Sequence, residues 1–173
     1  SIPDAMGLAI RTPLGLVIHT GDFKIDHTPV DGRPTDLSIL ARLCADGVFL
    51  LLSDSTYAEV PGYTASERVV GEVLDQVIGE APGRVMVATF ASLISRLQQV
   101  IDAAFNHHRK VGVVGRSMVN NVKMALEMGY LIDQGGVLAP LSALRKLAPE
   151  RVVIVTTGSQ GEPTSALVRI ANR

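Results

Sequence analysis

One carboxylate stands where it would suit metal chemistry. The apolar residues 14–18 are followed at once by residues 19–24, His-Thr-Gly-Asp-Phe-Lys. An apolar run that ends in a glycine and a single acid is typical of a strand that delivers a carboxylate to a sheet edge. There Asp22 could bridge two metal ions about 3.5–4 Å apart, which would stabilise both the attacking and the leaving oxygen of a phosphodiester. Alternatively, Asp22 forms a turn or a helix cap, and His19 is a hydrogen-bonded residue at a strand end.

A second acid follows a longer apolar run. Residues 48–52, Val-Phe-Leu-Leu-Leu, form the continuous apolar stretch expected of a buried strand, and Asp54 comes two residues later. A carboxylate there could support a metal ligand through a hydrogen bond, or it could accept hydrogen bonds within its own loop. The residues alone favour the second interpretation.

Three hydroxyl residues follow three apolar runs in the second part of the chain. The runs are residues 85–88, 111–114 and 152–155, and the hydroxyl residues are Ser92, Ser117 and Ser159. A helical pattern follows each of them, the last one over residues 165–172. Strands that alternate with helices predict a parallel sheet with right-handed crossovers, so the three strand ends should share one rim.

This rim could bind a phosphate. Ligands of open α/β sheets lie beyond the carboxyl ends of the strands, where helix N-termini offer free N–H groups to an anion. Arg116 could add a bidentate contact to phosphate, and Phe90 could stack on a base. The alternatives are that each serine only caps its helix and that Phe90 packs in the core.

Local patterns predict the elements that carry these residues in the first part of the chain. Residues 8–10 and 16–18 should form a hairpin around the turn residues 12–15. Asp36 should cap a helix that ends at Gly47.

A domain boundary is expected at Pro61-Gly62, where turn residues interrupt the pattern. Thr64 and Glu67 then match a capping box at the start of a helix. The core face of that helix should consist of Val69, Val70, Val73, Val77 and Ile78.

Composition limits the class of protein. Of the 173 residues, 47% are hydrophobic and 19% charged, which predicts a packed globular core. The single cysteine, Cys44, allows no internal disulfide and fits a reducing cytoplasm, where it would act as a small buried hydrophobe. No apolar run approaches 18 residues, so we expect no membrane span.

The net charge of −1 gives no global basic field, so binding of RNA would need a local basic groove. Five basic residues close together in sequence could supply part of one, or they could be solvated charges on helix faces and loops. These residues are Arg96, Arg109, Lys110, Arg116 and Lys123.

Six short motifs, in the same order, resemble those of the ribonuclease J family. They are residues 1–4 (Ser-Ile-Pro-Asp), 19–24, 52–56 (Leu-Ser-Asp-Ser-Thr), 88–92 (Ala-Thr-Phe-Ala-Ser), 114–118 (Val-Gly-Arg-Ser-Met) and 157–163 (Thr-Gly-Ser-Gln-Gly-Glu-Pro). Members of this family are metallo-β-lactamase enzymes with an inserted β-CASP domain. The resemblance implies an α/β fold. Residues 1–60 would be the C-terminal part of a metallo-β-lactamase core sheet, and residues 61–173 part of a β-CASP domain with a parallel sheet flanked by helices.

The resemblance also implies a function. It is that of a cytoplasmic, zinc-dependent ribonuclease that processes and degrades RNA, including rRNA, as a 5′-to-3′ exonuclease and an endonuclease, and that forms homodimers or homotetramers. Asp22 matches the family's bridging ligand of two zinc ions, and Asp54 its first acidic β-CASP motif. The residues implied to bind RNA are Phe90, Ala91, Ser92, Arg116, Ser117 and Ser159.

The chain also departs from the family pattern. It has no His-x-His-x-Asp-His run, no His before Ser1 and no later His-x-Ser-Gly-His segment, and residues 93–95 read Leu-Ile-Ser instead of Asn-x-His. Catalytic zinc needs about three protein ligands per ion. We therefore expect an internal piece of a longer enzyme that is inactive alone.

Two alternatives stay open. One is a non-catalytic RNA-binding or oligomer-scaffold relative, which the substitution at residues 93–95 favours. The other is a related hydrolase of another phosphoester or ester, which residues 157–163 disfavour. In the nuclease, two zinc ions would convert a bridging water to the hydroxide that attacks phosphorus.

Overall fold

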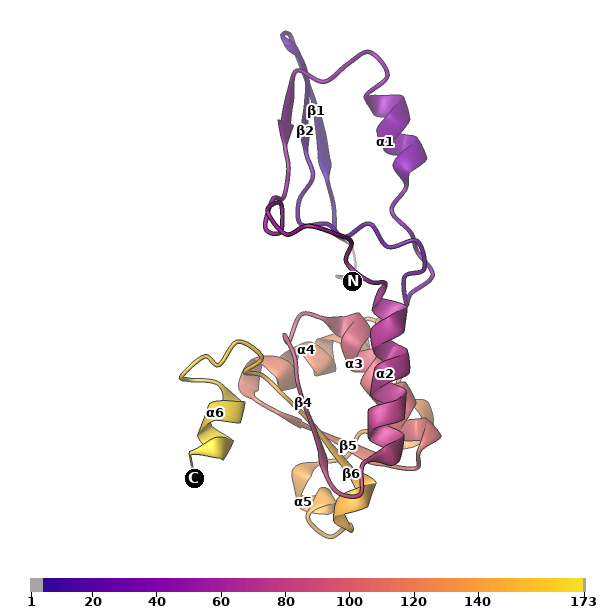
Figure 1. Ribbon diagram of the computed structural model, residues 1–173, viewed down its shortest axis with the longest axis vertical. Coiled ribbons are helices and arrows are strands. Elements are labelled where there is room, and N and C mark those ends of the chain that lie inside the picture. The colour runs from indigo at the N-terminus through magenta and orange to yellow at the C-terminus, as the bar shows by residue number, and fades with distance from the viewer. Residues whose placement is uncertain (1–4, 173) are drawn as a thin grey trace. The chain divides into compact units, whose positions relative to one another are not determined.

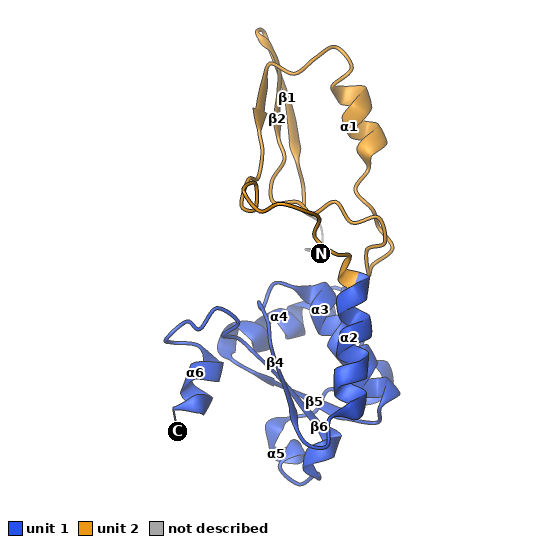
Figure 2. Cartoon of the chain, in the orientation of Figure 1, with its two compact units in different colours: residues 1–2, 68–173 blue, residues 3–67 orange. Residues whose placement is uncertain are grey.

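The computed structural model describes residues 5–172, so the motif at residues 1–4 lies outside the described residues. The chain divides into two compact units (Figure 2). We call residues 3–67 the N-terminal unit and residues 68–173 the C-terminal unit.

The N-terminal unit is built on the expected hairpin (Figure 1). β1 (Leu8–Thr12) pairs antiparallel with β2 (Gly15–His19), and β3 (Leu50–Leu52) adds to β2 in parallel. The Thr12 hydroxyl donates to the Gly15 carbonyl oxygen at 2.8 Å across the turn. Gly15 has a φ of +135°, which only glycine adopts without strain.

The helix of this unit, α1 (Leu37–Leu43), begins as predicted. The Asp36 carboxylate accepts a hydrogen bond from the Ile39 N–H at 2.9 Å. The helix ends earlier than expected, at Leu43, and Cys44 is its partly buried C-cap.

The prediction of a buried third strand was wrong for the described chain. The side chains of Leu50, Leu51 and Leu52 are 45–58% exposed. The strand order is β1-β2-β3, so β3 is an edge strand paired on one side. Among the described residues of this unit, the buried hydrophobic side chains are Leu16 and Ile18, both on β2.

The C-terminal unit contains the expected parallel sheet, in the order β4-β6-β5 (Figure 1). Its strands are β4 (Val85–Ala88), β5 (Lys110–Val114) and β6 (Val152–Thr156). The helices are α2 (Glu67–Glu80), α3 (Ile94–Asn106), α4 (Arg116–Glu127), α5 (Leu141–Leu144) and α6 (Ala166–Ala171), with 3-10 turns η1 (Gln134–Gly136) and η2 (Pro149–Arg151). One core joins α2, α3 and α4 to the sheet, and it includes the fully buried Ile78, Val100 and Val153.

α2 differs from its prediction in two ways. Ile78 is buried and Leu74 packs against the core, but Val69, Val73 and Val77 form a second row with exposures of 47–53%. The expected capping box at Thr64 is also wrong, because α2 begins at Glu67. The acceptor for the Glu67 N–H is the carboxylate of Asp26, at 2.9 Å.

Among the described residues, none of the helices combines the length and apolar character that a membrane crossing needs.

Candidate functional site

The loop after β2 presents Asp22 to solvent. Two hydrogen bonds restrain the backbone just before Asp22. The Thr20 N–H donates to the Leu52 carbonyl at 3.0 Å, and the Gly21 N–H donates to His19 Nδ1 at 3.0 Å. Gly21 has a φ of +63°, and a Cβ there would lie 2.7 Å from the Met6 carbonyl oxygen. The Asp22 side chain is exposed and makes no hydrogen bond or ion pair with another described residue.

Among the described residues, the carboxylate of Asp54, unlike that of Asp22, makes hydrogen bonds within its own loop. Its Oδ1 accepts hydrogen bonds from the Thr56 hydroxyl at 2.7 Å and the Thr56 N–H at 3.0 Å, and its carboxylate also faces the Phe23 N–H. These hydrogen bonds, those of Thr56 first, hold the pKa of Asp54 below its ordinary value. The Asp54 N–H donates to the Thr20 hydroxyl at 3.1 Å, so Asp54 connects both sides of Asp22.

The described residues do not by themselves form a zinc site. Residues 5–172 contain no group of three or more His, Cys, Asp or Glu side chains that could hold a metal ion. Catalytic zinc takes about three protein ligands, and Asp22 offers one free carboxylate.

In the C-terminal unit, the three strand ends meet on one rim. Ala88 and Val114 both lie in register with Thr156 of the central strand. The segments that follow border an open, shallow hollow of about 340 Å³. Its lining residues are Thr89, Phe90, Ala91, Ser117, Thr157, Gly158, Glu162, Thr164 and Ser165.

Three of the six residues predicted to bind RNA line this hollow. Phe90, Ala91 and Ser117 come together there, and Phe90 is 49% exposed. Ser92, Arg116 and Ser159 are exposed and are not among the lining residues.

The serines do not serve as side-chain caps of their helices. Leu93 is the N-cap of α3, and Gly115, with a φ of +110°, is the N-cap of α4. Ser159 was expected near a helix start, but α6 begins seven residues later, where the Ser165 hydroxyl accepts from the Val168 N–H at 3.3 Å.

Sequence reasoning missed several residues of the hollow. Thr157 and Glu162 belong to a motif that carried the resemblance, so that motif was an available signal. Glu162 adds a chemical feature, because its Oε2 is buried and has no hydrogen-bond partner among the described residues. A carboxylate beside hydroxyl groups suits a ligand that donates hydrogen bonds.

The five basic residues do not form one groove. Arg109 is buried and donates to the carbonyl oxygens of Ala81 at 2.6 Å and Gly83 at 2.8 Å. Lys110 is the first residue of β5, whereas Arg116 follows its last residue, so the two lie at opposite ends of that strand. Lys123 is exposed and lies 3.8 Å from Glu127 on the same helix.

Residues 82–173, more than half of the chain, match the family model described as "Ribonuclease J, beta-CASP domain". The chain belongs to the ribonuclease J family. The match includes all three loops of the hollow, so the hollow is a feature of the β-CASP domain. The α/β fold and the family predicted from the sequence are both confirmed.

Relatives named Ribonuclease J align with the whole chain. The protein of Corynebacterium glutamicum is 50% identical over 173 residues, which is 100% of this chain and 24% of the relative. Those of a Synechocystis strain and of Thermus thermophilus are each 52% identical over 99% of this chain, and 27% and 30% of their own lengths are covered. The chain thus spans about a quarter to a third of these ribonuclease J relatives. Asp22 and Asp54 lie in the part that aligns with them but precedes the β-CASP match.

Proposed function

We propose that this chain is part of a metal-dependent ribonuclease that hydrolyses RNA phosphodiester bonds. The observation that carries the proposal is the identity of 50–52% to proteins named Ribonuclease J over at least 99% of the chain. The exposed and unpartnered Asp22 on a restrained loop gives the proposal a chemical basis.

In this proposal Asp22 contributes one carboxylate to a pair of zinc ions, and the other ligands come from outside residues 5–172. Asp54 supports the loop from which Asp22 projects, through the hydrogen bond of its N–H to the Thr20 hydroxyl and the proximity of its carboxylate to the Phe23 N–H. The 173-residue chain alone would then lack nuclease activity, because one carboxylate is too few for catalytic zinc.

The hollow of the β-CASP domain would bind the RNA. Ser117 lies in the first turn of α4, a helix of 12 residues whose free N–H groups favour phosphate. Phe90 is exposed enough to stack on a base. Glu162 would accept a hydrogen bond from a ribose hydroxyl, which DNA lacks at the 2′ position.

The finer activity belongs to the same proposal. We propose 5′-to-3′ exonuclease and endonuclease activity in RNA processing and decay, including that of rRNA, by a cytoplasmic homodimer or homotetramer. A linear RNA labelled at its 5′ end reports exonuclease activity as released mononucleotides. A circular RNA has no ends, so its cleavage reports endonuclease activity alone.

The central experiment compares the full-length enzyme with its Asp22→Asn variant. We expect Asp22→Asn to lower bound zinc and RNA cleavage together, and a chelator to abolish cleavage by the unaltered enzyme. Asp31→Asn is the matched control, because Asp31 is an exposed acid of the same unit. Cleavage that persists in Asp22→Asn with zinc unchanged would contradict the proposal.

A second candidate is a non-catalytic RNA-binding relative. Residues 93–95 favour it, because Leu93 and Ser95 stand where the family pattern has Asn and His. Leu93 is the partly buried N-cap of α3, and its apolar side chain cannot make the polar contacts of an amide. RNA binding without cleavage by the full-length protein, at saturating zinc, would establish this second function.

A further inference from the structure

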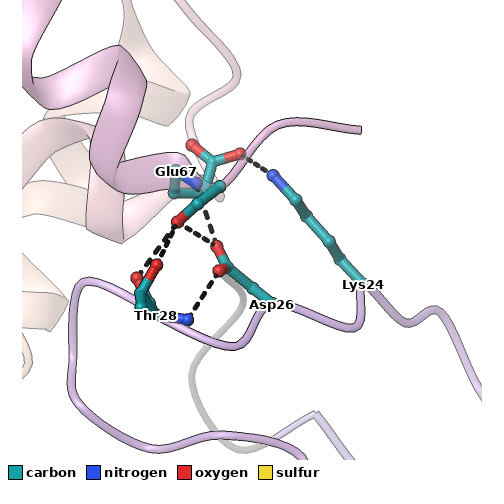
Figure 3. Close-up of polar contacts among 5 residues, drawn as sticks. Lys24, Asp26, Thr28 and Glu67 are labelled. Atoms are coloured by element: carbon teal, nitrogen blue, oxygen red, sulfur yellow. Dashed lines mark hydrogen bonds and ion pairs between the residues drawn. The ribbon is translucent and has the colours of Figure 1, made fainter. Parts of the chain in front are cut away.

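A cluster of five polar residues ties the chain just after Asp22 to a distant segment (Figure 3). The members are Lys24, Asp26, Thr28, Ser66 and Glu67. All five belong to the N-terminal unit. Lys24 is two residues from Asp22, so the cluster begins where the loop of the proposed metal ligand ends.

Asp26 is the centre of the cluster. Its Oδ2 accepts hydrogen bonds from the Glu67 N–H at 2.9 Å and the Ser66 hydroxyl at 3.0 Å, and its Oδ1 accepts one from the Thr28 N–H at 3.0 Å (Figure 3). Burial acts to raise the pKa of Asp26, but these hydrogen bonds and the Lys24 charge outweigh it and lower that pKa. The carboxylate is therefore held in its charged form by fixed donors.

Lys24 adds a charged contact to the same segment. Its Nζ lies 2.8 Å from Glu67 Oε1, and the two side chains are only 20% and 13% exposed. By contrast, the surface pair Lys123–Glu127 is 3.8 Å apart with side chains 76% and 66% exposed. Partial burial reduces solvent screening, so the Lys24–Glu67 pair restrains its loop far more than the surface pair restrains its helix.

Asp22 is thus restrained from both directions along the chain. On one side, the Thr20 N–H and hydroxyl contact Leu52 and Asp54. On the other side, Phe23 contacts Asp54 and Lys24 contacts Glu67. A metal ligand must be held to within about 0.5 Å, and it is the neighbours of Asp22, not its own side chain, that supply this restraint.

We propose that Lys24 and Asp26 are positioning residues for Asp22, acting through their contacts to Ser66 and Glu67. This inference rests on the proposed function, in which Asp22 binds metal. If Lys24 and Asp26 only stabilised the fold, their substitution would lower the melting temperature and leave the zinc affinity of the folded protein unchanged. Zinc affinity therefore distinguishes a positioning role from a purely structural one.

The test uses the full-length enzyme with Lys24→Met, which removes the charge and retains the length of the side chain. We expect zinc affinity to fall about 3- to 10-fold, which is less than the roughly 10- to 100-fold lost when a direct hydrogen-bond partner of a metal ligand is removed, because Lys24 acts on Asp22 only through the backbone. We expect kcat to fall with it while the KM for labelled RNA stays within about 2-fold, because no RNA contact is removed. The paired exchange of Lys24→Glu with Glu67→Lys should recover part of the zinc affinity that Glu67→Lys alone loses.

Lys123→Met is the matched control, since it makes the same change in the exposed pair and should leave zinc affinity unchanged. If Lys24→Met does not fold, Glu67→Gln removes the same ion pair and replaces it in the test. Zinc affinity within about 2-fold of the unaltered enzyme in the folded variant would overturn the inference. Loss of zinc in Asp22→Asn but not in Lys24→Met would overturn the inference alone, whereas zinc retained in Asp22→Asn would overturn the proposed function.

Discussion

The carboxylate of Asp54 faces the backbone N–H of Phe23, the residue that follows Asp22, and this N–H helps to lower the pKa of Asp54. The carboxylate also accepts two hydrogen bonds from Thr56, so the acid that follows β3 connects two loops. Removing the carboxylate would release the backbone beside Asp22, whereas an isosteric amide would keep an oxygen acceptor.

We therefore predict a graded effect at Asp54 in the full-length enzyme. Asp54→Ala should lower zinc affinity and RNA cleavage about 10-fold or more, and Asp54→Asn should have a clearly smaller effect. Zinc content and cleavage rate measured side by side check this. Equal losses in the two variants would mean that Asp54 contacts the metal directly.

Gly158 is predicted to be essential for the loop that borders the hollow. Its φ is +118°, and an added Cβ would lie 2.6 Å from the Ser165 hydroxyl oxygen and 2.8 Å from the Leu167 Cβ. Gly158→Ala should therefore add a steric cost of about 1–3 kcal/mol to the backbone strain of similar size, for a total loss of roughly 2–6 kcal/mol in the free energy of unfolding, as measured by urea denaturation.

Gly161 provides the matched control in the same loop. Its φ is +72°, but no atom lies within 4 Å of the added Cβ, so Gly161→Ala should cost only the backbone term of about 1–2 kcal/mol. If Gly161→Ala destabilises as much as Gly158→Ala, the steric argument is wrong.

The pairing between α2 and α3 should make stability depend on pH. Asn106 Nδ2 donates to Asp75 Oδ1 at 3.1 Å, and His107 Nε2 lies 3.2 Å from Asp75 Oδ2. The hydrogen bond from Asn106 first, and then the nearby His107 imidazole, lower the pKa of Asp75 from its ordinary 3.8, against the effect of partial burial. A lowered pKa stabilises the folded state above the unfolded value, and that stabilisation is lost as pH falls through the folded pKa.

Asp75→Asn should therefore lower stability near neutral pH and have little effect well below pH 3.8. The free energies of unfolding of the two proteins should differ by less than about 1 kcal/mol near neutral pH, since the Asp75 side chain is 44% exposed and solvent screens its charge. Melting temperatures of both proteins across this pH range check the prediction. If the difference between the two melting temperatures grows as the pH falls, the pKa of Asp75 is not lowered in the folded state and the prediction is refuted.

The sequence predicted those elements whose causes are local. The Asp36 cap acts on a residue three positions away, and the hairpin turn closes over Thr12–Gly15, so both patterns lie within one short segment. The alternation of apolar runs with helices likewise placed three loops on one rim.

The failures have long-range causes. The Glu67 N–H is capped by Asp26, 41 residues upstream, and no pattern near residue 64 contains that acceptor. An apolar run such as residues 50–52 gives strand character, but its exposure depends on which strands and helices cover it. Glu162 and Ser165 reach the hollow only because of the path of the loop after β6, which the residue types do not specify.

Glu162 gives the sharpest test of how RNA lies in the hollow. Its carboxylate lines the hollow among hydroxyl residues, and one of its oxygens is buried without a partner among the described residues. If this carboxylate accepts from a ribose 2′-hydroxyl, removing either partner leaves the other unsatisfied, while removing both costs little more. We therefore predict that a single 2′-deoxy substitution in the RNA lowers kcat/KM for the full-length enzyme about 5- to 10-fold at one position, and that Glu162→Ala loses this discrimination there. Thr164→Ala, in the same loop, should keep it. Equal discrimination by the enzyme and Glu162→Ala at every position would show that the 2′-hydroxyl is recognised elsewhere.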